Sequence, residues 1–362
     1  MVKKTKKESK NGPQFSKSKF ESVGMKVPEK KITMQELTSR LKHKLPFDME
    51  KLTGIHEVHK CSKGEDSYFL AVEAAKECLR YSKHKAKDIE MIIVCSISKY
   101  KGGMTHIYEP PFSILIKQEL GANKALTFDI SNACAGMLTG VYLMDNYIKN
   151  GIIKKGMVIS GEYITTIADN AVENVKSIAS MELASLTVGD AGAAVILERA
   201  EPGEEGLMAS NFTTLAKYSD LCIGKPDRKR PGAIMKARAR KIHRIAISDS
   251  PPLLKRALDL SGLTFNEIDR IIPHQTSERS IMSGIKHMGR LFGVTPKNVV
   301  INLHDFGNTA STTHFVALYK YLQEGKLEKG ERIMLICYAS GLVVGVVIFT
   351  MDDMVKKYGS SN

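Results

Sequence analysis

The chain has 362 residues, of which 43% are hydrophobic and 25% are charged. This composition is ordinary for a folded globular protein, so fibrous and largely disordered classes are excluded, and the length suggests two domains or one duplicated domain. No apolar run approaches the ~18 residues that a membrane-spanning helix needs, and no apolar stretch follows the basic first residues, which excludes a secretory signal. We therefore expect a cytoplasmic protein without a membrane span.

The formal net charge of +14 is concentrated in two short segments. Residues 1–20 contain seven Lys and one Glu, and residues 224–244 contain nine Lys or Arg and one Asp. These two surpluses account for the whole net charge of the chain. The composition of residues 1–20 predicts a disordered basic tail. A neutral body with two basic patches favours capture of an anionic substrate or carrier over binding of duplex nucleic acid.

Apolar runs alternate with amphipathic stretches along the chain, which predicts strands and helices packed as an α/β layered fold. Strands are expected at 91–96, 125–130, 157–160, 193–197, 270–272, 299–303, 332–337 and 343–349. Helices are expected at 67–81, 112–120, 136–150, 251–261, 279–292 and 312–324.

The two halves of the chain resemble one another at a nearly constant separation of about 175 residues. AKDIEMIIVCSIS at 86–98 matches FNEIDRIIPHQTS at 265–277, and IKNGIIKKGMVIS at 148–160 matches LQEGKLEKGERIMLIC at 322–337. A single long repeat indicates a duplicated domain rather than a solenoid. The expected parts are the tail at 1–20, an N-terminal half at 21–200, a basic connecting segment at 201–244 and a C-terminal half at 245–355.

The chain has six cysteines, but no CxxC pair and no Cys/His cluster with zinc-like spacing. Most lie in apolar surroundings, so we expect reduced thiols and neither disulfides nor a metal site. Cys134 differs, because DISNACAGMLTG at 129–140 predicts a strand end, a turn of small residues and a helix beginning near this cysteine. Unpaired N–H groups and the positive end of the helix dipole would favour its thiolate. A structural cysteine among small apolar residues is the alternative.

Two further polar residues lie at comparable positions. His274, in IIPHQTSERSI, follows a short apolar strand and precedes a helix, and Asn308, in DFGNTASTTH, also stands between an expected strand and a helix. Taken singly, each is more often structural. Together with Cys134 they lie at strand-to-helix junctions on the same edge of the expected sheets, where α/β sites form. They supply a nucleophile and two hydrogen-bond donors, the groups that thiol-based acyl transfer needs.

The motifs TGIHEVH, NACAG, GDAGAAVIL, PHQTSER and GNTAS occur in the order and at the spacing of a known family. From about residue 20 to 355 the chain resembles the thiolase superfamily, specifically the β-ketoacyl-acyl-carrier-protein synthase III group. The resemblance implies a thiolase fold, which is a duplicated five-layered αβαβα sandwich, and a homodimer. It also implies a catalytic triad of Cys134, His274 and Asn308, with an oxyanion hole made by the backbone N–H groups of Cys134 and Gly341.

The resemblance also implies the partners. The substrates are acyl-CoA or acyl-carrier-protein thioesters, and CoA or phosphopantetheine enters as part of the substrate, so no separate cofactor is expected. Arg279 and Lys286 match positions at which the family's cations meet the acidic carrier protein, and part of 224–244 would extend this patch. A solvated helix face is the alternative interpretation of these cations.

Three departures from the family pattern bear on the substrate. Ala339-Ser340-Gly341-Leu342 stands where primary-metabolism members have GGGF, and the last glycine is kept. Those members have a Trp before TGI that stacks on the adenine of CoA, whereas this chain has no Trp. HIYEPP places Glu109 before a proline, as in secondary-metabolism relatives that join two acyl units in olefin synthesis or make dialkylresorcinols and pyrones. In that branch the Glu acts as a base in the partner subunit's pocket. A loop Glu before a helix-opening Pro-Pro is the alternative.

The sequence therefore predicts a ketosynthase. Cys134 takes an acyl group from a thioester, and the acyl group undergoes Claisen condensation with a second acyl or β-ketoacyl thioester, with cyclisation to a resorcinol, cyclohexanedione or pyrone as a further step. Decarboxylative condensation with a malonyl carrier, as in fatty-acid initiation, is the first alternative. An inactive partner subunit of a ketosynthase pair and a nucleic-acid binder are the others. The intact triad argues against the former, and the absence of aromatic residues from 224–244 argues against the latter.

Overall fold

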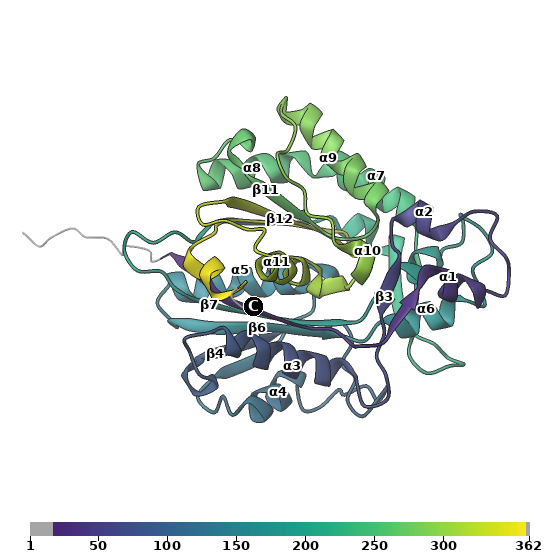
Figure 1. Cartoon of the computed structure of the whole chain (residues 1–362), viewed down its shortest axis with the longest axis horizontal. Coiled ribbons are helices and arrows are strands. Elements are labelled where there is room, and N and C mark those ends of the chain that lie inside the picture. Colours follow the sequence, from purple (N-terminus) through teal and green to yellow (C-terminus); the bar gives the residue numbers. More distant parts are fainter. Residues whose placement is uncertain (1–16, 360–362) are drawn as a thin grey trace, which may run out of the picture.

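The computed structural model describes residues 17–359 (Figure 1). Most of the tail predicted at 1–20 lies outside the described residues. Its last residues belong to the first strand, which begins at Ser18. The folded part of the chain therefore starts slightly earlier than the sequence predicted.

The first sheet has five strands in the order β1-β7-β6-β4-β5. Its strands are β1 (Ser18–Lys26), β4 (Met91–Val94), β5 (Leu126–Asp129), β6 (Lys155–Glu162) and β7 (Ala191–Arg199). β4 runs parallel to β5 and β6, whereas β7 runs antiparallel to β6 and β1. All residues of β4 are buried, as expected of a parallel strand covered by helices on both faces.

The second sheet has the order β11-β12-β13-β8. Its strands are β8 (Leu207–Thr214), β11 (Arg270–Pro273), β12 (Arg332–Ala339) and β13 (Val343–Thr350). β11 is parallel to β12, and β13 is antiparallel to β12 and β8, which repeats the arrangement of the first sheet. This agrees with the predicted duplication. β8 comes from the predicted connecting segment 201–244, so the second half recruits residues from before position 245.

Helices and sheets form five layers, as the resemblance implies (Figure 1). α3 (Ser67–Arg80) and α4 (Phe112–Leu120) cover the outer face of the first sheet. α5 (Gly136–Lys149) and α11 (Thr313–Gln323) lie between the two sheets. α8 (Pro251–Ser261) and α9 (Glu278–Phe292) cover the outer face of the second sheet.

Several short elements that the sequence did not predict surround this sandwich, and Figure 1 shows α1, α2, α6 and β3 grouped at one end. The helices are α1 (Met34–Ser39), α2 (Met49–Thr53), α6 (Thr165–Ala171), α7 (Ala239–Asp249) and α10 (Leu303–Phe306). The strands form two antiparallel pairs, β2 (Lys31–Thr33) with β3 (Glu57–His59) and β9 (Cys222–Pro226) with β10 (Ala233–Ala237).

The strand predicted at 299–303 is wrong. Only Val299 forms a bridge, to Ile271 on β11, and α10 begins at Leu303. In this parallel pairing the backbone N–H of Ile271 donates to the carbonyl of Asn298, and the residue that would donate next is two positions later. That residue is Pro273, which has no N–H. The side chain of Gln275 takes over instead: its Nε2 donates to the carbonyl of Val300 at 3.0 Å. The ladder therefore stops, and the chain turns into α10.

The apolar core follows the layers. One cluster fills the space between the two sheets around α5 and α11, and a second lies between the second sheet and its outer helices. The side chains of β12 point alternately into the two clusters, because successive residues of a strand face opposite sides of the sheet. Leu335 and Cys337 belong to the first cluster, and Ile336 belongs to the second. Within residues 17–359, no helix combines the length and the apolar character needed to cross a bilayer.

Candidate active site

Cys134 lies in the middle of the short 3-10 turn η2 (Ala133–Ala135), which connects β5 to the central helix α5. Ala133 has φ +46°, a conformation that turns the chain sharply before the cysteine. Cys134 is partly buried and packs against both the cluster between the sheets and the cluster beyond the second sheet. It therefore stands at the junction of the two halves.

The electrostatic surroundings of Cys134 differ from the sequence-based expectation of a thiolate. Burial, followed by the charge of the nearby Glu162, raises the pKa of the Cys134 thiol to about 12, although its own backbone N–H acts in the opposite direction. The helix N-terminus is present, but desolvation of the thiolate outweighs it. The resting group is a thiol that must lose its proton when substrate arrives.

His274 follows β11 and is buried. Its backbone N–H donates to the carbonyl of Ile336 on the neighbouring strand at 2.8 Å. Its ring Nδ1 lies 2.7 Å from the carbonyl oxygen of Tyr338, and its Nε2 lies 3.0 Å from Oδ1 of Asn308. Two carbonyls of β12 therefore fix the backbone and the ring of His274.

Asn308 lies between α10 and the turn η6 (Ala310–Thr312), so it follows a short helix and not the predicted strand. Its backbone N–H donates to the carbonyl of Thr187 at 2.8 Å. Gly307 permits this approach: its φ is +63°, and a Cβ there would lie 2.6 Å from the same carbonyl oxygen. Oδ1 of Asn308 accepts from the N–H of Ala310 at 3.0 Å, which fixes the orientation of the amide. No hydrogen bond within residues 17–359 uses its Nδ2, which is left free to donate.

The ring of His274 has acceptors at both nitrogens. A backbone carbonyl can only accept, and Oδ1 of Asn308 is already identified as the oxygen by the N–H of Ala310. Burial by itself would lower the pKa of His274, but interactions with Cys337, Tyr338 and Asn308 outweigh it and the pKa is raised. Since Nδ1–H donates to Tyr338, the ring carries a hydrogen on Nε2 as well only when it is protonated.

His314, which the sequence analysis missed, lies beside His274 with 6.1 Å between ring centroids. Its Nε2 donates to the carbonyl of Ile336 at 2.9 Å, the same carbonyl that receives the backbone N–H of His274. Burial, followed by the charge of His274, lowers the pKa of His314 to about 3. His314 is therefore neutral and supports the strand that holds His274. Its position in the first turn of an apolar helix gives no sign of this in the sequence.

The three candidate residues meet at one place. Cys337, on β12, interacts electrostatically with both Cys134 and His274, and β12 contacts the turn that carries Cys134. His274 and Asn308 contact each other directly. The structure thus brings together a thiol and two side chains able to donate hydrogen bonds, from the segments that follow β5, β11 and α10.

The two predicted oxyanion-hole groups belong to segments next to β12. Gly341 lies in the loop between β12 and β13, and the next residue, Leu342, exchanges backbone hydrogen bonds with Leu215. The backbone N–H of Gly341 donates to no group within residues 17–359 and is available to a ligand oxygen. The backbone N–H of Cys134 interacts with its own thiol.

Glu109 is exposed and lies in the loop between β4 and α4. Its carboxylate takes part in no hydrogen bond or ion pair with the described part of this chain. The neighbouring Tyr108 is 80% exposed. The structure of one chain therefore does not bring Glu109 into contact with Cys134, and its role stays a prediction.

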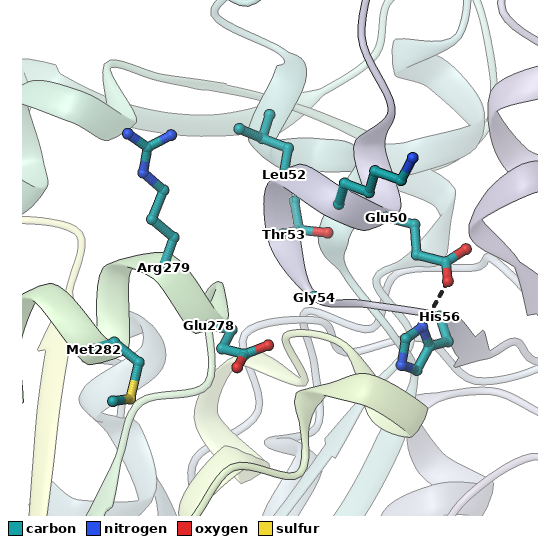
Figure 2. Close-up of a pocket in the computed structure, with 9 residues that line it drawn as sticks. Glu50, Leu52, Thr53, Gly54, His56, Glu278, Arg279 and Met282 are labelled. Carbon is teal, nitrogen blue, oxygen red and sulfur yellow. Dashed lines mark hydrogen bonds and ion pairs between the residues drawn. The ribbon is translucent and has the colours of Figure 1, made fainter.

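A cleft of about 430 Å³ opens between α2 and the start of α9. Figure 2 shows Arg279 and Met282 on the α9 side and Leu52 and Thr53 on the α2 side, with Arg279 at the rim. Lys286, further along α9, is exposed. The full lining of the cleft is Glu50, Lys51, Leu52, Thr53, Gly54, His56, Glu278, Arg279 and Met282. No tryptophan lines it, in line with the composition of the chain.

Comparisons with known proteins agree with this arrangement. The family model 3-oxoacyl-[acyl-carrier-protein] synthase III matches residues 128–216, and the model of its C-terminal part matches residues 258–351. Together they cover half of the chain, including the three candidate residues. β-Ketoacyl-[acyl-carrier-protein] synthase III of Desulfotalea psychrophila is 27% identical over 333 residues, which are 89% of this chain and 96% of the relative.

Solved structures share the fold. OleA of Xanthomonas campestris superimposes with a TM-score of 0.81 at 22% identity, covering 93% of this chain and 97% of OleA. One OleA structure contains bound lauric acid and lauroyl-CoA, and others carry substitutions at a glutamate, a cysteine or a histidine. 3-Oxoacyl-[acyl-carrier-protein] synthase III of Aquifex aeolicus superimposes with a TM-score of 0.77 at 23% identity, covering 92% and 99% of the two chains. The chain belongs to the β-ketoacyl-acyl-carrier-protein synthase III-like condensing enzymes of the thiolase superfamily, acyltransferases that make a carbon–carbon bond by Claisen condensation.

Proposed function

We propose that Cys134 accepts an acyl group from a thioester and that the acyl-cysteine then condenses with a second acyl or β-ketoacyl thioester. The observation that carries the proposal is the contact between His274 and Asn308, next to Cys337, which interacts electrostatically with both His274 and Cys134. In the first step the sulfur attacks the thioester carbonyl and the carrier thiol leaves. In the second step the other thioester loses an α-proton to a base, Glu109 in the leading version, or loses carbon dioxide in the malonyl version. The α-carbon of the resulting enolate attacks the acyl-cysteine carbonyl, and the cysteine sulfur leaves as a thiolate.

Each residue has a distinct role in this scheme. The N–H groups of Cys134 and Gly341 stabilise the oxyanion formed at the acyl-cysteine carbonyl. Nε2–H of His274 and Nδ2–H of Asn308 donate to the carbonyl oxygen of the second thioester, which becomes an enolate. For that, His274 must exchange its contact with Oδ1 of Asn308 for the substrate oxygen. The donors come from a rigid strand and a tight turn, so little reorganisation is needed.

The second substrate is where two versions of the proposal differ. The absence of Trp and the presence of Glu109 before a proline support a β-ketoacyl or unactivated acyl extender, with cyclisation as the next step. The binding of lauroyl-CoA by OleA, which shares the fold, agrees with long acyl substrates. Decarboxylative condensation with a malonyl carrier is the second candidate, and the names of the curated relatives favour it. Release of carbon dioxide in step with product formation distinguishes the two.

The division of roles predicts that His274→Ala still acylates Cys134 but fails to condense. Loss of one donor to a developing oxyanion costs ~2.7–4 kcal/mol, or about 10²–10³ in turnover. Intact-protein mass after incubation with a series of acyl thioesters measures acylation, and product formation with a second thioester measures condensation. If acylation collapses by the same factor as turnover, His274 is chiefly the base that activates the thiol.

The raised pKa of His274 sets the sign of the pH dependence. Nε2–H is present below that pKa and is lost as the pH rises through it, so condensation should fall at alkaline pH. Acylation should instead speed up, because the pKa of Cys134 is about 12 and the thiolate fraction grows across the same range. The two steps therefore have opposite pH profiles.

We further propose a carrier patch made of Arg279 and Lys286 on α9 and of Arg240, Lys241 and Arg244 on α7. All five are exposed, and α7 contacts α9. None of them forms an ion pair within the described part of the chain. The patch borders the cleft through Arg279, which suits a carrier protein that delivers its acyl group through that cleft.

Reversing the charge of the patch, with Arg279→Glu and Lys286→Glu, should raise KM for a carrier-bound substrate about tenfold at low salt. The difference should shrink as salt screens the attraction. Small thioester mimics should be used as before. A matched control is Lys85→Glu with Lys87→Glu, which makes the same charge change at exposed positions beside the first sheet. Equal loss with both substrates would indicate damage to the fold instead.

A further inference from the structure

Glu162, the last residue of β6, is a fully buried carboxylate without a cation. No ion pair within residues 17–359 involves it, and its exposed fraction is 0%. Five donors surround it instead. They are the N–H of Ile97 at 2.9 Å, the N–H and Oγ of Ser98 at 3.1 Å each, Oγ of Ser160 at 3.1 Å and Oγ of Ser311 at 2.5 Å. Burial raises the pKa of Glu162 above its ordinary range, and the hydrogen bonds from Ile97, Ser311 and Ser98 act in the opposite direction. A carboxyl group is costly to bury unless its hydrogen bonds are satisfied, as they are here.

The five donors come from three different parts of the chain. Ile97 and Ser98 belong to the loop after β4 that continues to Glu109. Ser160 lies on β6 itself. Ser311 lies in η6, three residues after Asn308, and its Oγ is also 2.7 Å from Oγ of Ser160. Glu162 therefore joins the first half of the chain to the turn that follows Asn308.

Ser311 occupies in the second half the place that Cys134 occupies in the first. Each is the middle residue of a 3-10 turn that leads into a central helix, and each follows an alanine with positive φ, +46° at Ala133 and +52° at Ala310. The two turns contact each other. A Cβ on Gly136, at the start of α5, would lie 3.7 Å from Cβ of Ser311. The hydrogen bond that holds Ser311 to Glu162 therefore also restrains the turn that carries Cys134.

We propose that Glu162 is a positioning residue of the condensation site, which holds the Asn308 turn and the Glu109 loop in a fixed relation to Cys134. The inference rests on the proposed function and adds a residue that touches neither substrate nor the reacting atoms. Its effect is transmitted through Ser311 to Asn308 and through the main chain of residues 97–98 to the loop beyond. The carboxylate also acts at a distance on the thiol of Cys134.

The titratable groups around Glu162 and Cys134 come from several elements. Glu162 on β6, Cys222 on β9 and Cys337 on β12 interact electrostatically with Cys134. Cys95, after β4, faces Glu162, and the ion pair of Lys99 with Asp129 lies beyond it. Of these, Glu162 is the carboxylate whose charge, after burial, raises the pKa of Cys134. Removing its charge should therefore lower that pKa.

The test compares Glu162→Gln with the wild-type enzyme in three measurements: acyl adduct mass, condensation rate and the pH profile of Cys134 alkylation by iodoacetamide. We expect condensation to fall about ten- to hundredfold, as for a small misplacement of catalytic groups. Adduct formation should stay within about twofold, and alkylation should shift to lower pH. Ser311→Ala removes the hydrogen bond to Glu162 but keeps the charge of Glu162. Condensation should therefore fall, while the pH profile of Cys134 alkylation stays as in the wild type.

Asp145→Asn is the matched control, because Asp145 is also a buried carboxylate, bonded to Ser18 and Lys149 at the far end of α5. It should lower thermal stability and leave the ratio of condensation to acylation unchanged. A parallel loss of acylation and condensation in Glu162→Gln, or no loss of either, would overturn the proposal. Absence of an adduct on Cys134 in the wild type would instead overturn the proposed function, so the two failures are distinguishable.

Discussion

Cys134→Ala should abolish covalent acylation and reduce condensation by about 10⁴-fold or more, because the scheme has no other route to an acyl-enzyme. The thiol stands where the two large apolar clusters meet. Peptide mapping after treatment with an acyl thioester measures the adduct directly. The change removes one sulfur from a partly buried site, so the fold should persist and a melting curve should confirm it.

Two neighbouring cysteines provide the controls for this result. Cys337 is fully buried beside His274, and Cys222 lies near Cys134 at the start of β9. Cys222→Ala and Cys337→Ala should each retain an adduct on Cys134. An adduct that persists in Cys134→Ala, on either neighbour, would show that the nucleophile has been misidentified.

The fold could be predicted from the sequence to the extent that its pattern repeats. The paired segments 86–98 and 265–277 are β4 and β11 with their flanking turns, and they occupy equivalent places in the two sheets. The prediction failed at 299–303, where an apolar run has the composition of a strand but its neighbour has Pro273 in the pairing position. A rule that reads each segment alone cannot detect a missing N–H on the adjacent strand.

The candidate site was predictable in its residues and not in its electrostatics. The motifs around Cys134, His274 and Asn308 mark their turns, whereas the charge that acts on the thiol comes from Glu162, twenty-eight positions later. A glutamate at the end of a mostly apolar strand is the one signal available in the sequence, since such a residue is seldom buried without a purpose. His314 gives no comparable signal.

The face that carries Glu109 has the features of an interface. β5 is the edge strand of the first sheet, and an open edge presents unpaired N–H and C=O groups. Around it several large apolar side chains are exposed, among them Leu126 at 60% and Tyr108 at 80%. Ile97, Met104 and Ile114 add to the same region. Such a patch suits a twofold contact in which a second copy covers the edge, which supports the homodimer that the family resemblance implies.

Within that dimer, Glu109→Ala should abolish condensation while Cys134 is acylated as in the wild type. An enzyme that loses carbon dioxide generates its carbanion without a base, whereas one that deprotonates a β-keto or unactivated thioester needs a carboxylate near the α-carbon. Glu109 has no partner within the described part of its own chain, so it is free to reach across. Glu109→Asp should restore little, because a side chain one methylene shorter would not reach the proton. Adduct mass and product formation separate the two steps.

Mixing subunits decides where Glu109 acts. If it serves the partner's site, a dimer of one Glu109→Ala chain and one Cys134→Ala chain contains one site with both wild-type residues and another with neither. Activity should then reappear when the two inactive variants are mixed under exchange conditions, approaching half of the wild-type rate per heterodimer. If Glu109 served its own chain's site, every site in the mixture would lack one residue and no activity would return. An inactive mixture, together with carbon dioxide release by the wild type from a malonyl substrate, would make decarboxylative condensation the leading function.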